Sequence, residues 1–457
     1  MTAKREGRLL VGVIIASQFA PPFMFSGVAV AVPTMGEELS MSATALGLVE
    51  TLFLAGSVAF LLPLGRLADA TDRGRLYKLG LLAFGLSSAL IGVLAASLPV
   101  LLVRFFQGAC SAVLSATGAA LLADLVPAER RGRAYGASIG TIYAGLTLGP
   151  ILAGVLVDTW GWRAVFFFGG GLLLLMYAMV ETMLPSSWRR PGRVVHLPSA
   201  ALVLGAVLLL VFGTANMADL RLGPALLAAG ILTTVVFVIL QRRLERPLLD
   251  VRALVRHRVL RTALLVQLLL YMSAFCSVFM LSIYLQTSLG HPAQTAGMVL
   301  SVGAVLMAVT APLAGALADR LRPRVIASVG VALVLISSII ATQLGPSSSL
   351  THVIAVLIFQ GLGFGLFSSP NMTIVMNSVE QHELSMASAL GAKSRSLGMI
   401  SGMLVTSLLI SLHYRGRPLS ADPQAFVTIL VTCFTVLTVL DALALLAGVV
   451  SRGSPAA

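Results

Sequence analysis

The sequence alternates between fourteen apolar blocks of about 20 residues and short segments that carry most of the charge. A helical block of this length crosses a hydrocarbon core about 30 Å thick. Charged residues make up 11% of the chain, against roughly 25% in soluble domains. We therefore predict an all-α polytopic membrane protein. The predicted spans are 9–33, 44–66, 76–97, 99–124, 134–157, 161–184, 197–216, 222–241, 260–286, 294–318, 324–344, 350–372, 385–412 and 424–449.

Basic residues distinguish the two sides of the predicted membrane. With the N-terminus inside, the cytoplasmic segments hold 24 of the 31 Lys and Arg residues and the external segments hold four. Cytoplasmic loops carry such an excess, so we expect a multi-pass inner (cytoplasmic) membrane protein with both termini cytoplasmic. This topology explains the net charge of +13, and we predict no nucleic-acid partner. The linker at 242–259 either sets topology or binds anionic lipid head groups.

The cysteines and histidines form no grouping that suggests catalysis or metal binding. Cys110, Cys276 and Cys433 lie far apart inside apolar blocks, and the six histidines are scattered. Neither pattern has the spacing of a metal site, a disulfide framework or a nucleophile with its base. We predict no catalytic residue, no metal, no cofactor and no enzyme. The basic N-terminus has no small-residue cleavage site, which predicts a retained first helix.

A short internal repeat suggests how the spans are grouped. The segment GRLAD at 65–69 recurs as GALAD at 315–319, and each copy ends an apolar span before a basic loop. Two six-helix halves in parallel repeat are found in a large class of secondary transporters. We predict an N-terminal six-helix bundle over 1–190, a two-helix insert over 191–249 and a C-terminal six-helix bundle over 250–457.

Three motifs carry a family resemblance. The loop at 65–75 reads GRLADATDRGR, the fourth span contains RFFQG at 104–108, and the fifth contains GLTLGPILAG at 145–154. Together they resemble the major facilitator superfamily, and within it the fourteen-helix drug:proton antiporters. Two departures are Asp72, where the loop pattern has Gly, and Ala153, where the antiporter signature GxxxGPxxGG has Gly.

The resemblance implies two bundles that rock around a central cavity and export substrate in exchange for protons. In the fifth span, small residues every four positions allow two helices to approach closely, and a proline bends the axis. We expect conformational roles for the following residues: Gly65, Asp69, Arg73, Arg75, Gly145, Gly149, Pro150, Gly154, Gly315 and Asp319.

Proton coupling requires an ionisable group inside the membrane. Of the 18 acidic residues, only Glu50 and Asp441 fall clearly within spans. Glu50, about two turns into the second span, is the first candidate, and Asp441 either contributes or pairs with a cytoplasmic arginine. The first span has Met24 where the family usually has an acid. Arg104 either couples protonation to movement or extends to the outer interface, since an arginine at mid-membrane costs about 2.5–3.5 kcal/mol.

Polar residues within spans define the predicted cavity. Lys393 and Arg395, with Arg104, give an intramembrane balance of three positive to two negative groups. That balance suits anionic or zwitterionic amphiphiles as well as cations, although Lys393 alternatively extends to the cytoplasmic interface. The predicted cavity residues are Glu50, Gln107, Gln267, Gln360, Asn371, Lys393 and Arg395.

These features predict a secondary active transporter that exports amphipathic drugs or metabolites in exchange for protons by alternating access. The alternative is a lipid or lysolipid exporter or flippase of the same fold, with the helices at 197–241 shaping a lipid gate. We expect a monomer whose partners are a small amphipathic substrate, protons and membrane lipids.

Overall fold

The computed structural model describes residues 2–127, 130–184, 196–244, 247–318, 320–419 and 422–450. Within these ranges the chain contains helices and no strands. Fourteen helical segments are long and apolar enough to cross a membrane. The predicted all-α class and the predicted number of spans are confirmed. The prediction for Asp319 lies outside the described residues, as does the side chain of Asp69.

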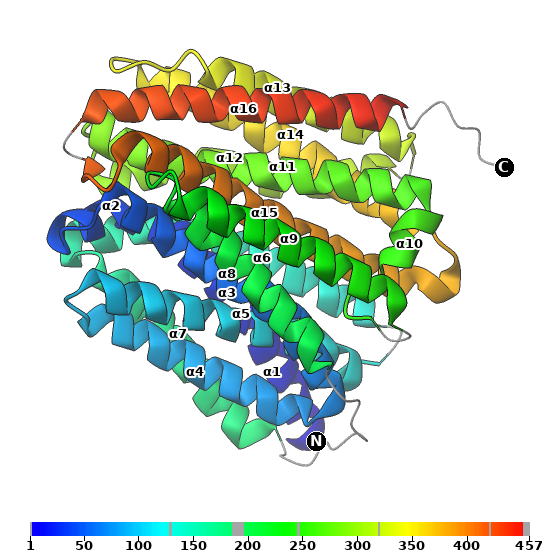
Figure 1. Ribbon diagram of the computed structural model, residues 1–457. Coiled ribbons are helices and arrows are strands. Elements are labelled where there is room, and N and C mark those ends of the chain that lie inside the picture. The colour runs from blue at the N-terminus through cyan, green and yellow to red at the C-terminus, as the bar shows by residue number, and fades with distance from the viewer. Residues whose placement is uncertain are drawn as a thin grey trace.

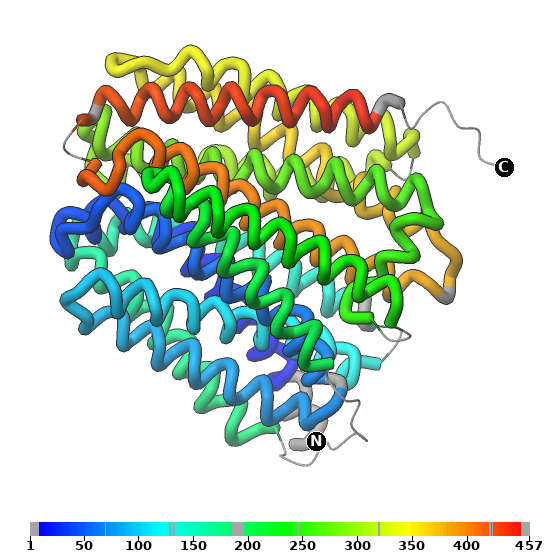
Figure 2. Tube along the Cα trace, viewed as in Figure 1, coloured from blue at the N-terminus to red at the C-terminus, as the bar shows by residue number. Residues whose placement is uncertain are grey.

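The helices form two groups joined by a hairpin and a short linker (Figures 1 and 2). The first group is α1 (Thr2–Ser17), α2 (Ala20–Glu38), α3 (Ala43–Ala70), α4 (Arg73–Val93), α5 (Ser97–Leu125), α6 (Arg131–Trp160) and α7 (Arg163–Met183). The hairpin is α8 (Leu197–Ala215) and α9 (Leu222–Arg243), followed by the short α10 (Val251–Arg256). The second group is α11 (Arg258–Ile283), α12 (Ala293–Ala318), α13 (Pro323–Ala341), α14 (Leu350–Met376), α15 (Leu384–Tyr414) and α16 (Pro423–Val450), with a π-helical turn at Tyr284–Ser288 and a 3₁₀ turn at Gln381–Glu383.

The first span differs from its predicted form. It is interrupted between α1 and α2, where Pro21 and Pro22 lack the backbone N–H needed to continue the preceding helix. At its other end, α2 runs through Pro33 to Glu38, so the predicted end at 33 is wrong. A single proline removes one hydrogen bond, and membrane helices tolerate this loss because neighbouring helices surround the site.

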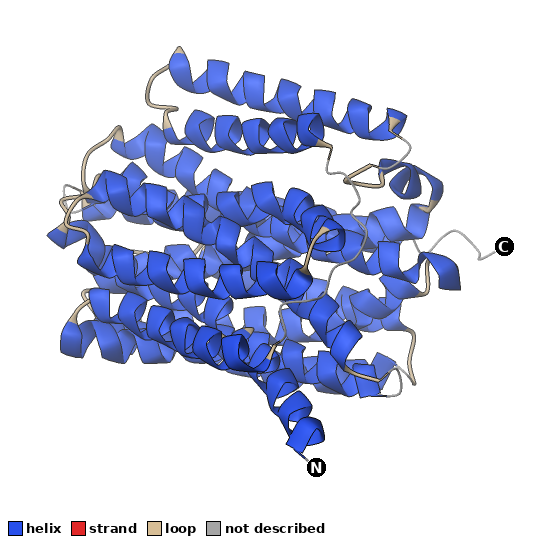
Figure 3. Ribbon diagram, turned by 90° about the horizontal axis from the view of Figure 1, so that it is seen from below, coloured by secondary structure: helices blue, strands red, loops and turns tan. Residues whose placement is uncertain are grey.

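The two groups are in contact mainly at one end of the molecule. The end of α16 and the short α10 lie at the other end, toward which the groups spread apart (Figure 1). The helices run roughly along a common direction (Figure 3). The main contacts between the groups are those of α6 with α12 and of α3 with α15. Because α10 and the starts of α4 and α13, where described arginines gather, lie at that open end, the closed end is the arginine-poor one.

The α8–α9 hairpin lies over the seam between the groups. Helix α8 contacts both α3 and α15. The Ser411 hydroxyl of α15 donates to the carbonyl of Ala215 at 2.8 Å, and the amide of Ala218 donates to Ser411 Oγ at 3.3 Å. The hairpin is therefore attached to the second group near the closed end.

Candidate functional site

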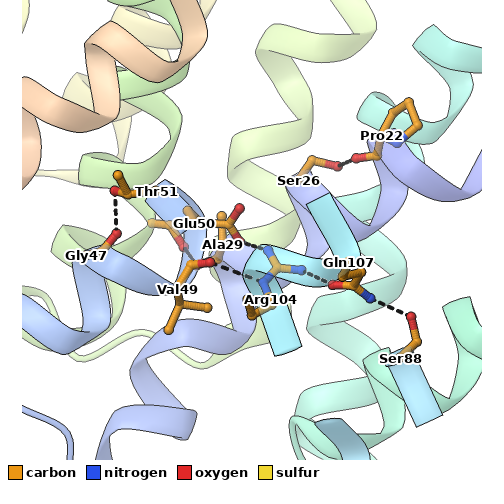
Figure 4. Close-up of polar contacts among 11 residues, drawn as sticks. Pro22, Ser26, Ala29, Gly47, Val49, Glu50, Thr51, Ser88, Arg104 and Gln107 are labelled. Atoms are coloured by element: carbon orange, nitrogen blue, oxygen red, sulfur yellow. Dashed lines mark hydrogen bonds and ion pairs between the residues drawn. The ribbon is translucent and has the colours of Figure 1, made fainter. Parts of the chain in front are cut away.

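A fully buried ion pair lies between α3 and α5 (Figure 4). Arg104 Nη2 donates to Glu50 Oε1 at 3.1 Å, and both side chains are 0% exposed. Arg104 Nε also donates to the carbonyl of Val49 at 3.1 Å. The second carboxylate oxygen, Glu50 Oε2, has no hydrogen-bond partner among the described residues. That oxygen can accept a proton without displacing the guanidinium.

Two glycines allow this pair to form. A methyl group at Gly56 would overlap the carbonyl oxygen of Phe105, and one at Gly108 would overlap that of Phe53. The backbones of α3 and α5 are therefore in direct contact one to two turns from the pair. This close approach brings Glu50 within hydrogen-bonding distance of Arg104, and larger residues at the two glycines would separate the helices.

The rest of the guanidinium is enclosed by aromatic and amide groups. Its central carbon lies 4.5 Å from the ring centroid of Phe53 and 5.8 Å from that of Phe166. Arg104 Nη1 donates to Gln107 Oε1 at 2.7 Å, and Gln107 Nε2 donates to Ser88 Oγ of α4 at 2.5 Å. Arg104 is thus surrounded by protein and does not extend to the outer interface, and Gln107 supports it inside the first group.

Asp441 lies in the second group and has no arginine partner among the described residues. Its Oδ2 accepts hydrogen bonds from Ser338 of α13 at 2.7 Å and from Ser273 of α11 at 3.0 Å. The side chain is 0% exposed, and Oδ1 has no partner in the described part of the chain. The alternative of a cytoplasmic arginine partner is therefore not what the structure shows.

Three of the predicted cavity residues are bonded to helices of the second group. Gln267 Nε2 donates to the carbonyl of Gly391 at 3.1 Å, and Asn371 Nδ2 donates to Gln267 Oε1 at 3.3 Å. Gln360 Nε2 donates to the carbonyl of Ala274 at 3.4 Å. These bonds join α11 to α14 and α15. Contact of these side chains with substrate stays a prediction.

Lys393 and Arg395 differ in their surroundings. Lys393 Nζ donates to the carbonyl of Leu248 in the linker at 2.8 Å. Arg395 is half-buried and makes no hydrogen bond or ion pair with the residues that the structure describes.

The small-residue motif of α6 contacts two helices: α2 in the first group and α12 in the second group. Toward α2, a methyl group at Gly149 would overlap Ser26 Oγ, and Ala153 lies against Gly27. Toward α12, Gly154 lies against the backbone of Ala293, and the carbonyl of Pro150 lies against Gly297. One face therefore holds α2 within the first group, and the other closes the contact between groups. Ala153 fits where the signature has glycine because the residue opposite it on α2 is Gly27, which has no side chain.

The loop motif between α3 and α4 bonds within itself, to α5 and to the linker before α10. Asp72 caps α4 by accepting from the Arg75 amide at 3.0 Å, and Arg73 Nη1 pairs with Asp124 Oδ2 of α5 at 2.9 Å. Arg66 Nη2 donates to the carbonyl of Pro247 at 2.6 Å. Asp72 thus replaces the glycine of the loop pattern with a helix cap.

The remaining motif glycines, Gly65, Gly145 and Gly315, differ in how closely other residues pack against them. A methyl group at Gly145 would meet the Phe19 carbonyl of the first span. Gly65 has no neighbour within 4 Å of an added methyl group, whereas one at Gly315 would lie 2.8 Å from Ser369 Oγ. The two copies of the repeat therefore differ in packing.

Several residues of the site were not predicted from the sequence. Phe53, Phe166 and Ser88 complete the surroundings of Arg104. Phenylalanines and serines inside apolar spans carry no signal that separates a site from ordinary packing. Gly56 and Gly108 were the detectable signal, because paired small residues on neighbouring spans indicate close helix approach.

Comparison with known proteins settles the family. The model of the Major Facilitator Superfamily matches residues 14–403 and, in a second, overlapping match, residues 263–450. The chain belongs to the major facilitator superfamily. This confirms the predicted family and shows a multi-pass membrane transporter rather than an enzyme.

Three bacterial proteins are similar to this chain over most of its length. It is 31% identical over 408 residues to the puromycin resistance protein pur8 of Streptomyces alboniger, covering 87% of this chain and 80% of that protein. It is 24% identical over 384 residues to the riboflavin transporter RibZ of Clostridioides difficile, with coverages of 82% and 81%. It is 27% identical over 418 residues to the probable actinorhodin transporter of Streptomyces coelicolor, with coverages of 87% and 72%.

Solved structures of superfamily transporters show the same fold. A bacterial homolog of the human lysosomal transporter Spinster, in an inward-facing and unoccupied conformation, matches with a TM-score of 0.72 and 15% identity over 99% of both chains. A POT family transporter in complex with 5-aminolevulinic acid matches with a TM-score of 0.72 and 13% identity over 95% of both chains. At these identities the likeness concerns the fold alone.

Proposed function

We propose that this protein exports amphipathic small molecules across the bacterial plasma membrane in exchange for protons, with Glu50 as the proton-exchange group. The observation that carries the proposal is the buried Glu50–Arg104 pair with its unpartnered carboxylate oxygen. Ionisable groups inside a membrane are expensive and are retained mainly for function. The relatives that confer puromycin or multidrug resistance support export as the direction of transport.

The pair is one residue from a contact between the two groups. Thr51, next to Glu50, has its hydroxyl 3.1 Å from that of Ser407 on α15. A proton on Glu50 Oε2 would remove the carboxylate charge and weaken the bond from Arg104 to Oε1, while the bonds of Arg104 to the Val49 carbonyl and the Gln107 amide oxygen would be unchanged. A change at Glu50 would act on the Thr51–Ser407 contact one residue away, so proton binding and the closed end are physically connected.

The proposed orientation in the membrane implies which side of the membrane the open end of the transporter faces. With the arginine-rich end in the cytoplasm, the closed end faces outward and the molecule is inward-facing. An exporter in this state would take up substrate from the cytoplasm or the inner leaflet. Proton binding from the opposite side would belong to the outward-facing state that follows rocking.

The test is gradient-driven transport in proteoliposomes. Glu50→Gln keeps the shape of the side chain but cannot exchange a proton, and we expect it to abolish transport driven by a pH gradient while counterflow exchange of substrate persists. Glu37→Gln is the matched control, because Glu37 is an exposed acid at the end of α2. A fluorescent lysolipid as a second cargo addresses the lipid alternative. Undiminished gradient-driven transport by Glu50→Gln would refute the assignment.

A further inference from the structure

We propose that Ser282 and Gln286 of the second group form a latch that holds the closed end of the transporter shut, by bonding to backbone carbonyls of α2 in the first group. The proposal rests on the proposed alternating-access function and names positioning residues for it. It depends on three observations: a carbonyl that a proline deprives of its usual donor, two side chains that cross between the groups, and the firm attachment of both partners to their own groups.

Pro33 leaves one carbonyl of α2 without its usual partner. In a helix each carbonyl accepts a hydrogen bond from the amide four residues later, and a proline at that position has no N–H to donate. Helix α2 continues through Pro33, so the carbonyl of Ala29 loses its donor within the helix. Ala29 is 1% exposed, and an unpaired backbone group inside a membrane costs several kcal/mol. This carbonyl therefore needs a donor from outside α2.

The second group supplies donors at this place. Ser282 Oγ of α11 donates to the Ala29 carbonyl at 2.8 Å. Gln286 Nε2, in the π-helical turn that follows α11, donates to the next carbonyl, that of Val30, at 3.1 Å and also lies 3.3 Å from Ser282 Oγ. Two successive carbonyls of the first group are thus bonded by two side chains of the second group that lie one helical turn apart.

The bond of Ser282 differs from those of the neighbouring hydroxyls. A serine or threonine inside a helix commonly bonds to the carbonyl four residues before it. Ser277 does so by donating to the carbonyl of Ser273 at 2.7 Å, and Thr287 donates in the same way to that of Ile283 at 2.7 Å. Ser282 instead donates across the seam between the groups, at the position where α2 offers a carbonyl without its helical donor.

Each half of the latch is attached firmly to its own group. Tyr284, at the start of the π-helical turn, is 0% exposed and donates from its hydroxyl to the carbonyl of Gly345 in the turn between α13 and α14. On the other side, Ser26 of α2 donates to the carbonyl of Gly145 in α6 at 3.3 Å. Rocking of one group against the other would therefore break the two bonds of the latch rather than carry both partners along.

The test is the accessibility of the closed end, measured without substrate or gradient. The reporter is Ser407→Cys on α15, because Ser407 contacts Thr51 of α3 and so lies between a different pair of helices. Purified full-length protein in lipid nanodiscs is labelled with a maleimide at constant pH, and the labelled peptides are measured by mass spectrometry. Ser282→Ala and Gln286→Leu should each speed labelling at position 407 by about 2- to 10-fold, the range of one neutral hydrogen bond.

Ser277→Ala is the matched control. It removes a buried serine hydroxyl from the same helix, but the bond that it removes stays inside that helix. Labelling at position 407 should therefore stay at the wild-type rate. Unchanged labelling in folded Ser282→Ala and Gln286→Leu, or an equal rise in Ser277→Ala, would overturn the latch.

A further variant tests why the latch is at this position. Pro33→Ala supplies the N–H that the Ala29 carbonyl lacks in the wild type. Adding Ser282→Ala to Pro33→Ala should then change labelling at position 407 by less than about twofold, because the carbonyl keeps a donor in its own helix. A full effect of Ser282→Ala in this background would show that the proline is not the reason for the latch.

This test fails or succeeds independently of proton coupling. If Glu50→Gln still transports along a pH gradient, the coupling assignment is wrong, but labelling is measured without a gradient and is unaffected. If Ser282→Ala and Gln286→Leu leave labelling unchanged while Glu50→Gln has lost gradient-driven transport, the latch is wrong and the coupling assignment stands.

Discussion

Removal of Arg104 should destabilise the protein more than removal of Glu50. In the variant Arg104→Met, the Glu50 carboxylate stays buried and loses its only hydrogen-bond donor among the described residues. An uncompensated buried charge of this kind costs about 3–5 kcal/mol. In Glu50→Gln, the guanidinium keeps its bonds to the Val49 carbonyl and Gln107 Oε1. The expected loss is smaller, about 1–3 kcal/mol, because a neutral amide oxygen replaces the carboxylate as the acceptor for Arg104 Nη2.

The double variant distinguishes a charge effect from a packing effect. Glu50→Gln combined with Arg104→Met contains no buried charge at this position. Replacement of both members of a buried ion pair is often nearly neutral, so the two losses should not add. We expect the double variant to be at least about 2 kcal/mol more stable than the sum of the single losses predicts, which is within the range for directly interacting residues.

The assay is reversible unfolding in mixed detergent micelles with increasing SDS, followed by tryptophan fluorescence. The cycle is measured at neutral pH and repeated at acidic pH. Protons neutralise a buried carboxylate as pH falls, so the stability lost in Arg104→Met should be largest at neutral pH and should shrink at acidic pH. Glu50→Gln should show no such pH dependence. Additive losses, or a loss below about 1 kcal/mol for Arg104→Met, would refute the assignment of a buried, charge-paired site.

Three further predictions concern packing and anchoring. Gly56→Ala should reduce the yield of folded protein because its methyl group meets the Phe105 carbonyl, whereas Gly171→Ala should be tolerated because nothing lies within 4 Å; size-exclusion chromatography checks both. Asp441→Asn should keep most of the stability because its amide oxygen can accept both serine hydrogen bonds, whereas Asp441→Leu should lose about 1–3 kcal/mol for each hydroxyl left unsatisfied, measured by SDS unfolding. Lys393→Gln should free the linker carbonyl of Leu248 and speed tryptic cleavage after Arg242 or Arg243, read by mass spectrometry.

The sequence was sufficient for the membrane fold because the controlling forces act locally along the chain. Each span must be long and apolar enough to cross the bilayer, and loop charges determine its direction. The exceptions are at prolines. The interruption at Pro21 and Pro22 and the continuation through Pro33 depend on how neighbouring helices surround the chain, which composition does not reveal.

The site could be predicted only in part, because its decisive contacts join distant segments. Glu50 and Arg104 were each identified as charges that lie inside spans. Their pairing depends on the close approach of α3 and α5 at two glycines, and sequence distance gives no measure of that approach. The partners of Asp441 are serines, which occur throughout apolar spans and carry no distinguishing pattern. Charges could therefore be located from the sequence, but their partners could not.

The position of a glycine relative to the two groups determines what its substitution should change. Gly56 and Gly108 lie at a contact inside the first group, which stays packed when the groups rock against each other. Gly154 and Gly297 lie at the contact between the groups, where a methyl group on Gly154 would be 2.7 Å from the Ala293 carbonyl. A larger residue at Gly154 should therefore disfavour only the closed end and leave the fold intact.

Gly154→Val tests this distinction. Overpacking at a close contact costs about 1–3 kcal/mol, and if that cost falls only on the closed state, the population ratio shifts by about 5- to 150-fold. A cysteine at Ser407, which lies at the Thr51 contact, should then react faster with a maleimide, while Cys110, Cys276 and Cys433 stay buried and serve as an internal control. Reduced stability in SDS with unchanged labelling at position 407 would show that Gly154 supports the fold rather than the conformational equilibrium.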